Sequence, residues 1–342
     1  MSIDTTSVAP LLLDAPAVVV SEHTLTFDGF RYVVRVARQG AGVTAPLVIL
    51  GGSSQDRFSW ARHEAALLPL CDVVTVDLPG YGDADPLPER YGMDFLAAAT
   101  RHMVDSLGLG EINLFGGCFG GAIALRFAQH YPDAVERLVL AGMTTFVPPE
   151  YEQAANRWLS MLDDGDYAAM AEELVARFMC PQGTGTIRRH AAIGRLIHRQ
   201  FMEQTPRQFR MAVADHNRRL MRHEWYRPEP VPPVPALVFT GEHDSLTPPA
   251  MGRHLAELLP GAAFTTVRDA DHLVHMERIE EFTDLLGRFL TDCPIDGLPY
   301  CNELEYPEPQ FPTDEFPAQQ FQAQQFQPQQ FQAQASAVDL PR

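Results

Sequence analysis

The chain of 342 residues has 46% hydrophobic and 20% charged side chains, enough apolar material for one large domain with an insertion or for two domains. Its formal net charge is −18, and every basic residue is arginine, because the sequence contains no lysine. This acidic balance argues against general nucleic-acid binding, which depends on lysine and arginine side chains that neutralise phosphates.

The five cysteines are scattered, without CxxC pairs or the spacing of zinc ligands, and the sequence implies neither a metal nor an organic cofactor. No apolar run reaches the roughly 18–20 residues that a membrane helix needs. Residues 1–22 contain Asp4 and Asp14 and no early basic residue, which predicts a loose leader rather than a signal peptide. Together these features predict a soluble cytoplasmic protein.

The first part of the core is expected over residues 23–143. Alternating apolar and polar residues around Asp28-Gly29 predict a β-hairpin over 23–37. Continuous apolar runs typical of strands buried on both faces then alternate with helical patterns. In chain order, these strands and helices are predicted at Leu47–Leu50, 57–68, Val73–Val76, 93–107 and Val135–Ala141.

The stretch Ile112–Phe127 reads INLFGGCFGGAIALRF. An apolar strand, a nucleophile flanked by glycines and a helix form the pattern of a nucleophile elbow, a sharp turn that lifts one side chain above the sheet. Gly116 and Gly120 are expected to be needed there because the helix packs tightly against the strand. The residue at the tip is Cys118, where the usual elbow carries serine.

Residues 144–232 interrupt this rhythm and are expected to form an inserted helical cap. Helical patterns without a convincing strand fall at 152–162, 167–179, 187–201 and 206–222. The second part of the core is expected over 233–293, with strands at 236–240 and 263–267 and helices at 249–259 and 277–290. Strands that alternate with helices predict an α/β fold with a mainly parallel central sheet covered by helices on both faces.

The composition changes after Cys293, and residues 294–342 are expected to form a disordered tail rich in proline, glutamine and phenylalanine. Phenylalanine recurs at every fifth position from Phe316 to Phe331, with few aliphatic residues between. So little aliphatic material is insufficient for a packed core.

A thiol nucleophile needs a base that takes its proton and a third group that orients the base. Asp244 follows the strand predicted at 236–240, and His272 follows the strand predicted at 263–267. The chain order Cys118, Asp244, His272 is the order of nucleophile, acid and base that elbow-type sites use. The sequence therefore predicts a catalytic triad of these three residues.

Neighbouring residues leave alternatives open. Glu242 and Asp271 compete with Asp244 for the role of the acid, and Asp244 is favoured because it lies furthest into its loop. His275 competes with His272 for the role of the base, but it lies three residues on, where the following helix is expected to begin.

The chain resembles the α/β-hydrolase fold over residues 24–291, through the glycine-rich loop after an early strand, the DLPGYG turn, the elbow, the GEHDSLTPP loop and the DADH loop. Within this superfamily it is similar to thioesterases and acyltransferases, including synthases of hydroxyalkanoyloxy-alkanoate lipids. The GGCFGG box also resembles the cysteine lipase box of polyhydroxyalkanoate synthases. The chain departs from the usual pattern of this family at two places. It has Gly51-Gly52 where His-Gly is common, and it has a cysteine where the nucleophile is more often serine.

The resemblance implies a mechanism for these residues. Cys118 attacks an acyl carbonyl, His272 takes the thiol proton, and Asp244 holds the histidine. The tetrahedral oxyanion is met by the backbone N–H groups of Ser53 and Phe119.

A cysteine nucleophile favours thioester substrates, because one thioester then replaces another at little cost. We expect acyl groups on coenzyme A or on an acyl carrier protein, with transfer or hydrolysis to follow. Arginines that are frequent in the predicted cap reverse the local charge and suggest a docking surface for an acidic carrier protein or for coenzyme A phosphates. They are Arg188, Arg189, Arg195, Arg199, Arg207, Arg210, Arg218, Arg219, Arg222 and Arg227. A solvated helix face is the simpler alternative.

Two other functions remain open from the sequence. The same fold could close a ring on a carrier-bound chain, as thioesterase-like cyclases do. Alternatively, the chain could be a binding protein without catalysis that keeps the elbow only as architecture.

Overall fold

The structure is a computed structural model that describes residues 16–181, 184, 186–222, 227, 229, 231 and 233–309. The first fifteen residues of the predicted leader and the phenylalanine repeat lie outside these residues. Among the helices in the described part of the chain, none has both the length and the apolar character that a membrane span needs.

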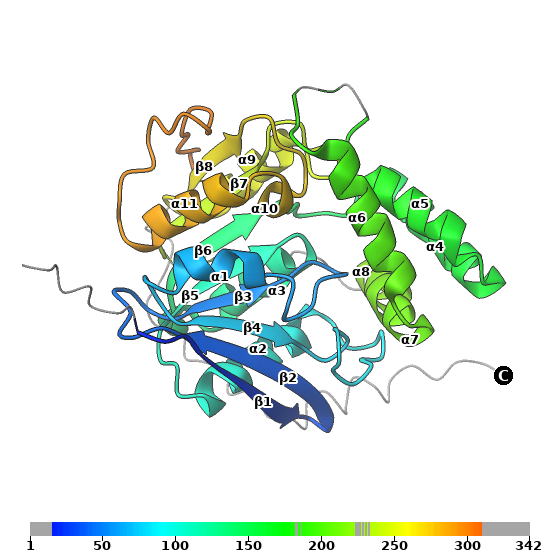
Figure 1. Ribbon diagram of the computed structural model, residues 1–342, viewed down its shortest axis with the longest axis horizontal. Coiled ribbons are helices and arrows are strands. Elements are labelled where there is room, and N and C mark those ends of the chain that lie inside the picture. The colour runs from blue at the N-terminus through cyan, green and yellow to red at the C-terminus, as the bar shows by residue number, and fades with distance from the viewer. Residues whose placement is uncertain are drawn as a thin grey trace, which may run out of the picture.

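An eight-stranded sheet forms the centre of the molecule (Figure 1). Its strand order is β1-β2-β4-β3-β5-β6-β7-β8; the pairs β1–β2 and β2–β4 are antiparallel, and the other neighbours are parallel. The strands are β1 (Val19–Phe27), β2 (Phe30–Arg38), β3 (Leu47–Leu50), β4 (Val73–Asp77), β5 (Ile112–Gly117), β6 (Val135–Ala141), β7 (Ala236–Gly241) and β8 (Ala263–Val267). The predicted α/β fold with a mainly parallel sheet is confirmed.

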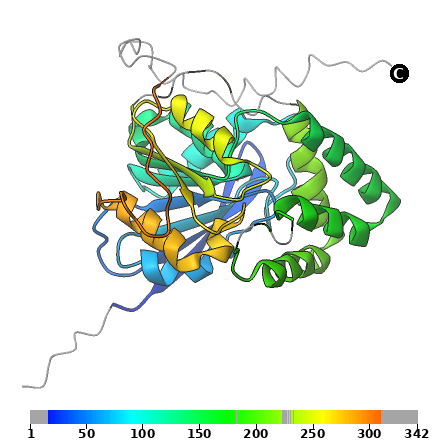
Figure 2. The ribbon, with the colours of Figure 1, turned by 90° about the horizontal axis from the view of Figure 1, so that it is seen from above.

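Helices cover both faces of this sheet, as the view from above shows (Figure 2). One face is packed by α2 (Met93–Ser106), α3 (Phe119–His130) and α9 (Pro249–Glu257). The other is packed by α1 (Ala61–Leu67), α10 (Val274–Glu277) and α11 (Ile279–Leu290). Central strands that are buried on both faces require apolar side chains at successive positions, which explains their continuous apolar runs.

Between β6 and β7 the chain leaves the sheet and forms a layer of helices, named here the helical insertion (residues 149–222, green in Figure 1). It consists of α4 (Pro149–Asp164), α5 (Tyr167–Phe178), α6 (His190–Glu203), α7 (Pro206–Phe209), a π-helical turn (Arg210–Asp215) and α8 (His216–Arg222). The helices share an apolar cluster of their own, which includes the buried Trp158 and Phe201.

Two helices begin later than the sequence predicts, and the structure gives a reason for each. The helix expected from residue 57 begins at Ala61, because the Arg57 N–H donates to the Asp77 carboxylate at 2.7 Å and holds this segment in a turn. The helix expected from residue 187 begins at His190, because Arg189 has a φ of 60°, in the left-handed region.

Both ends of the core extend beyond the predicted bounds. Strand β1 begins at Val19, inside the segment that was expected to be a leader. Residues 294–305, expected to be disordered, pack against the outer edge of the sheet, where Cys301 is buried and pairs with Val267 of β8. The predicted tail begins too early, because apolar residues such as Leu298 pack against the core before the glutamine-rich repeat begins.

Candidate active site

Cys118 lies in the turn between β5 and α3, above the carboxyl edge of the parallel strands. Its φ of 50° and ψ of −117° place a residue with a side chain in a region that favours glycine. The turn is held from both sides, since the Cys118 N–H donates to the Ala141 carbonyl at 2.8 Å and its carbonyl accepts from the Gly121 N–H at 2.9 Å. Backbone strain of this kind is concentrated at functional sites, where the surrounding structure enforces it.

The two elbow glycines leave no room for a side chain. A Cβ on Gly116 would lie 2.7 Å from the Cβ of Ala124 in α3. A Cβ on Gly120 would lie 2.1 Å from the carbonyl oxygen of Leu50 in β3. The close approach of α3 to β5 and β3 therefore requires glycine at both positions.

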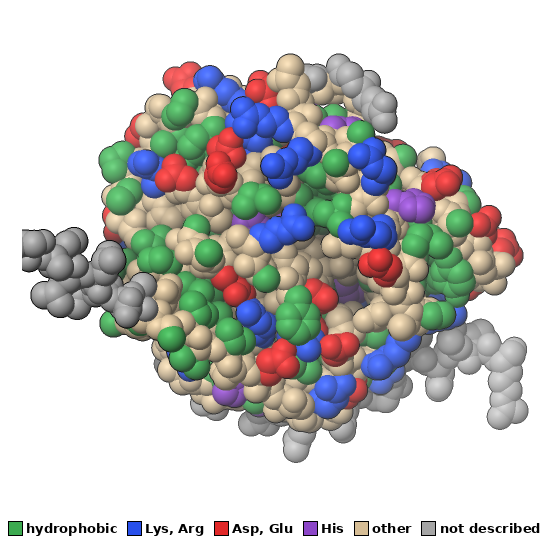
Figure 3. Space-filling view, viewed as in Figure 1, with side chains coloured by type: hydrophobic (Ala, Val, Ile, Leu, Met, Phe, Trp, Pro, Cys, Tyr) green, Lys and Arg blue, Asp and Glu red, His purple; other side chains and the backbone are tan. Residues whose placement is uncertain are grey.

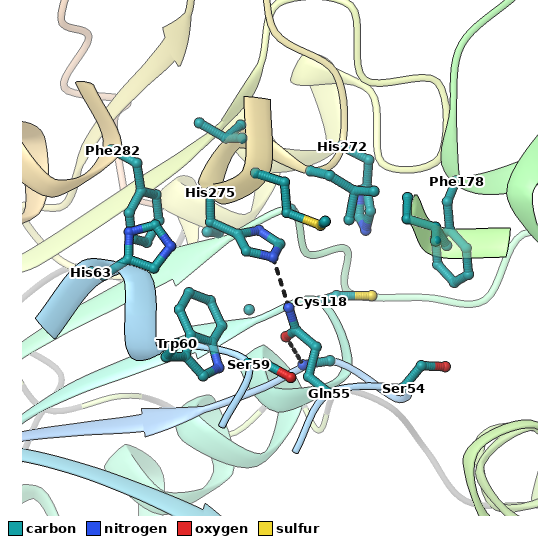
Figure 4. Close-up of a pocket in the computed structure, with 18 of the residues that line it drawn as sticks. Ser54, Gln55, Ser59, Trp60, His63, Cys118, Phe178, His272, His275 and Phe282 are labelled. Carbon is teal, nitrogen blue, oxygen red and sulfur yellow. Dashed lines mark hydrogen bonds between the residues drawn. The ribbon is translucent and has the colours of Figure 1, made fainter. Parts of the chain in front are cut away.

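The structure brings Asp244 and His272 together beside Cys118. Asp244 follows β7 and His272 follows β8, and the His272 Nδ1 lies 2.9 Å from the Asp244 Oδ2. Both side chains are almost completely buried. Cys118 and His272 line the same cavity, in which Figure 4 shows the sulfur below the His272 ring.

The competing residues have other partners. Glu242 accepts the N–H of Asp269 at 3.1 Å, outside the buried pair. Asp271 accepts the His272 backbone N–H at 2.8 Å rather than contacting its ring. His275 lies in α10, as expected, and its Nε2 is 2.8 Å from the side-chain nitrogen of Gln55.

A dense set of hydrogen bonds fixes the Asp244 carboxylate. Oδ1 accepts the backbone N–H groups of Leu246 and Thr247 at 2.9 and 2.8 Å. Oδ2 accepts the hydroxyls of Thr247, at 2.7 Å, and of Thr240. Burial by itself would raise the pKa of Asp244, but His272 and these donors outweigh it and lower the pKa below its ordinary value.

The same pairing acts in the opposite direction on His272. Burial alone would lower the pKa of the imidazole, but the Asp244 carboxylate and the neighbouring Cys118 raise it well above its ordinary value. The Asp244 carboxylate therefore stabilises the imidazolium that forms when His272 takes up a proton.

The predicted oxyanion groups flank the cysteine. Phe119 is the first residue of α3, so its backbone N–H lies at the N-terminal end of that helix. Ser53 follows β3, and both residues line a cavity together with Cys118. The loop of Ser53 is fixed by Gln55, whose Oε1 accepts the Gly52 N–H at 2.6 Å.

A cavity of about 340 Å³, named here the large cavity, opens on one side of Cys118. The core contributes aromatic walls that include Trp60, Phe115 and Phe282, and the helical insertion contributes Phe178 and Phe201. Figure 4 shows Phe178 on one side of the cysteine and Trp60, His63 and Phe282 on the other. This size and apolar lining are typical of small-molecule sites.

Two further histidines line the large cavity: His63, which was not predicted, and His275, which was considered only as an alternative base. His63 and His275 both pack against Trp60, and the His275 ring is tilted by 32° to it with centroids 4.8 Å apart. Burial lowers the pKa of His63 to about 4 and that of His275 to about 3, so both are neutral at neutral pH. A lone histidine on a helix has no sequence signal for such a position; only the fold brings them here.

The arginines of the predicted docking surface are divided in the structure. Arg219 is 0% exposed and donates to the Tyr91 carbonyl at 2.7 Å, so it cannot belong to a docking surface. Arg222 pairs with Glu89 and Arg227 pairs with Asp94, each at 3.1 Å. Figure 3 shows arginines near the border between the core and the helical insertion, with acidic side chains among them.

One cluster of potential metal ligands occurs next to the site. Side-chain atoms of Cys180, His190 and Asp271 lie within 4.8 Å of one another. Both oxygens of Asp271 already accept backbone N–H groups, from His272 and from Cys180. The cluster therefore joins the helical insertion to the histidine loop without requiring a metal.

The chain is similar in sequence and in fold to several known proteins. Residues 45–279 match a family described as having the alpha/beta hydrolase fold. A 2-hydroxy-6-oxononadienedioate/2-hydroxy-6-oxononatrienedioate hydrolase of Burkholderia vietnamiensis is 26% identical over 77% of this chain and 92% of its own length. The enol-lactonase of Burkholderia xenovorans has 25% identity and a TM-score of 0.68, with 79% of this chain and all of that chain covered.

A second relative is larger than this chain. The dihydrolipoyllysine-residue acetyltransferase component of the acetoin cleaving system of Pseudomonas putida is 28% identical over 73% of this chain. The match spans 64% of that relative's length.

Proposed function

Since the chain belongs to the alpha/beta hydrolase fold family, we propose that it is an enzyme that transfers or hydrolyses acyl groups through a thioester on Cys118. The observation that carries this proposal is the position of Cys118 in a strained turn beside the buried His272–Asp244 pair. A nucleophile next to a base that is itself oriented by a third group is the arrangement that covalent acyl transfer needs.

In the first step, the thiol proton passes to His272 and the sulfur of Cys118 attacks the acyl carbonyl. The backbone N–H groups of Ser53 and Phe119 stabilise the oxyanion, and losing one such donor typically reduces turnover about 10²–10³-fold. The bond to the leaving thiol then breaks, and His272 returns its proton to that thiol. In the second step, His272 deprotonates water or another nucleophile, which releases the acyl group and restores the thiol.

The nucleophile favours a thioester substrate. Attack of a thiol on a thioester exchanges one thioester for another. Attack on an oxygen ester instead converts that ester into a more reactive thioester, which is unfavourable. The relative named as a dihydrolipoyllysine-residue acetyltransferase supports acyl transfer as one outcome. The large cavity, with its aromatic and aliphatic walls, is proposed to hold the acyl chain.

A second candidate is hydrolysis of a dienedioate, as in the relative of that name. Such a substrate carries two carboxylates and needs cationic partners. Among the described residues that line the large cavity, Arg62 is the only arginine, and His63 and His275 are neutral. This scarcity of positive charge supports the acyl thioester over the dienedioate.

We further propose that the helical insertion acts as the cap over the acyl chain, because Phe178 and Phe201 complete the cavity wall. A carrier protein that docks on this cap would contact exposed arginines, such as Arg188 and Arg189 just before α6 and Arg195 within it. Arg219 is not part of this proposal.

Intact-protein mass spectrometry after incubation with acetyl, butyryl and octanoyl thioesters tests the proposed function. The wild type and Cys293→Ser, which changes an exposed cysteine, should gain the mass of one acyl group. Cys118→Ala should gain none, and His272→Ala should gain it far more slowly. An adduct that persists in Cys118→Ala would overturn the assignment of the nucleophile.

A further inference from the structure

A second, smaller cavity also borders Cys118, with a volume of about 50 Å³, and shares Ser53, Gly142 and Phe178 with the wall of the large cavity. It is named here the small cavity. The core contributes Ser53, Phe119 and Thr144 to its wall, and the helical insertion contributes Tyr151 and His216. At roughly 10–15 Å³ for each water-sized centre, this volume admits a group of only a few atoms. It is thus too small for a long acyl chain but lies directly beside the reacting sulfur.

Polar atoms in the wall of the small cavity lack partners. No described side chain hydrogen-bonds a ring nitrogen of His216, whose one polar neighbour of this kind is the backbone of Gly80, and the Thr144 hydroxyl lacks a partner among the described residues. The two residues are 1% and 7% exposed. A buried polar group without a partner costs about 1–3 kcal/mol, so atoms of this kind next to a cavity indicate a ligand that satisfies them.

The His216 ring is held in place and cannot turn away to find partners elsewhere. It stacks on Phe119 with centroids 4.5 Å apart and an interplanar angle of 13°. Tyr81 packs against it, also at 4.5 Å. His216 also follows directly on the π-helical turn Arg210–Asp215, a rare backbone form that occurs frequently at functional sites.

Three other polar side chains of the wall, those of Tyr151, Asn217 and Thr247, already have hydrogen-bond partners. The Tyr151 hydroxyl donates to the Asn217 Oδ1 at 3.0 Å, and the Asn217 amide donates to the Val213 carbonyl at 2.7 Å. Thr247 is bound to Asp244. His216 and Thr144 are therefore the groups that a ligand would meet.

The small cavity selects against charge. No aspartate, glutamate or arginine is among the described residues that line it. Burial, together with the nearby Arg219, lowers the pKa of His216 well below its ordinary value, although the backbone of Gly80 opposes the shift. A neutral imidazole presents one donor and one acceptor, and a hydroxyl presents both.

We infer that the small cavity is the subsite for the non-acyl part of the substrate, and that it takes an uncharged group that both donates and accepts hydrogen bonds, through His216 and Thr144. This inference rests on the proposed function, in which Cys118 carries the acyl group. An amide two carbons from a thiol sulfur, as in a cysteamine arm, has this chemistry, and so does the hydroxyl of an acceptor alcohol. Either group would lie beside the sulfur of Cys118: the cysteamine arm as part of the leaving thiol in the first step, and the alcohol as the acceptor in the second step.

The test compares two octanoyl thioesters of similar length, the N-acetylcysteamine ester and the S-pentyl ester, which lacks the amide. We expect the wild type to prefer the amide in kcat/KM. His216→Phe and the isosteric Thr144→Val should each lower kcat/KM for the amide ester about 3- to 10-fold and spare the S-pentyl ester, as expected for one lost hydrogen bond. His63→Phe, a matched change in the large cavity, should alter both esters by the same factor.

Separate measurement of the two steps assigns the source of the group. A loss in acylation identifies the arm of the leaving thiol, and a loss confined to deacylation by 1,2-propanediol identifies an acceptor hydroxyl. Equal losses with both esters in both variants, or a wild type without preference in either step, would overturn the inference.

Binding to Cys118→Ala separates this inference from the proposed function, because that variant forms no acyl-enzyme. N-acetylcysteamine should bind Cys118→Ala more tightly than pentanethiol does, and Thr144→Val in the same background should remove the difference. If this preference is present while no thioester acylates the wild type, the subsite stands and the proposed function fails. If the preference is absent, the subsite fails.

Discussion

The core and the helical insertion contribute different things to the site. The core supplies Cys118, Asp244 and His272 from the ends of β5, β7 and β8, and hydrogen bonds fix Asp244 and His272. The helical insertion supplies walls, such as Phe178 in the large cavity and His216 in the small one. The comparison indicates that the reacting groups of the proposed reaction come from the core alone, whereas the walls of both cavities come from the core and the helical insertion together.

This division has a physical basis. The helical insertion has an apolar cluster of its own, so its cavity-facing side chains can change without altering the packing of the sheet. The strand ends have no such freedom, because parallel strands hold their loops in a fixed order along one edge.

The largest effect is expected from the core. Cys118→Ala should reduce turnover of a good thioester substrate by about 10⁴-fold or more, because no other group replaces the nucleophile. Steady-state release of the free thiol measures it, with Cys293→Ser as the control. Near-normal turnover in Cys118→Ala would break the comparison, because the reaction would then not depend on the elbow.

Asp244→Asn should lower kcat/KM by about 10²–10⁴-fold, since the amide no longer favours the imidazolium and can present the wrong atom to His272. A retained rate would show that Asp271 or Glu242 holds the base instead.

The pH dependence of the same variant sharpens the result. A histidine with a raised pKa contributes stability that is complete below the unfolded value, near 6.5, and declines as the pH rises toward the folded value. The lowered pKa of Asp244 means that its own contribution is lost in strong acid, below its ordinary value of about 3.9. The difference in free energy of unfolding between wild type and Asp244→Asn should therefore be largest between these two values and smaller at pH 9. Urea unfolding at several pH values measures it.

In the helical insertion, Leu196→Trp should shorten the acyl chain that the large cavity accepts. We expect kcat/KM for an octanoyl thioester to fall about 10–100-fold and that for an acetyl thioester to change little, as one extra large group in an apolar pocket does. Met202→Trp, an exposed position on the same helix, is the control. Equal losses for both chain lengths would place Leu196 in the reaction rather than in specificity.

The smallest effect concerns His63, a buried histidine of the core that the proposed reaction does not use. Its pKa of about 4 means that between pH 6.5 and 4 the unfolded chain binds a proton that the folded protein does not. The free energy of unfolding should thus fall with decreasing pH, by about 1.4 kcal/mol per unit from this residue. His63→Phe should remove that share of the slope.

Chemical unfolding at pH 7.5 and 5.5 checks this value. Phe282→Leu, which removes packing beside His63 but no titrating group, should lower the stability equally at both pH values. An unchanged slope in His63→Phe would show that other groups account for the acid sensitivity.

Much of the core could be predicted from the sequence because its signals are local. The strands at Leu47–Leu50 and Val135–Ala141 have the predicted bounds, since each is a continuous apolar run between turn residues. The elbow glycines and the loops of Asp244 and His272 also follow their strands directly. Their proximity in space follows from the parallel order of the sheet.

The walls of the site could not be predicted in this way. A helical pattern over 206–222 gives no sign of the π-helical turn that precedes His216, nor of which residues face Cys118. Gln55 and His275 meet across 220 positions of the chain, and only the folded sheet brings them together. The arginine-rich pattern likewise did not indicate that Arg219 is buried.

The segment that follows α11 affects whether the sheet edge of one molecule can pair with that of another. Strand β8 ends the sheet order, so its outer edge would offer unpaired backbone groups to any neighbouring strand. Glu305 exchanges two backbone hydrogen bonds of 2.8 Å with Phe264, and Asn302 donates to Thr266 at 2.9 Å. The chain thereby occupies its own sheet edge, which protects the protein against edge-to-edge aggregation at that side.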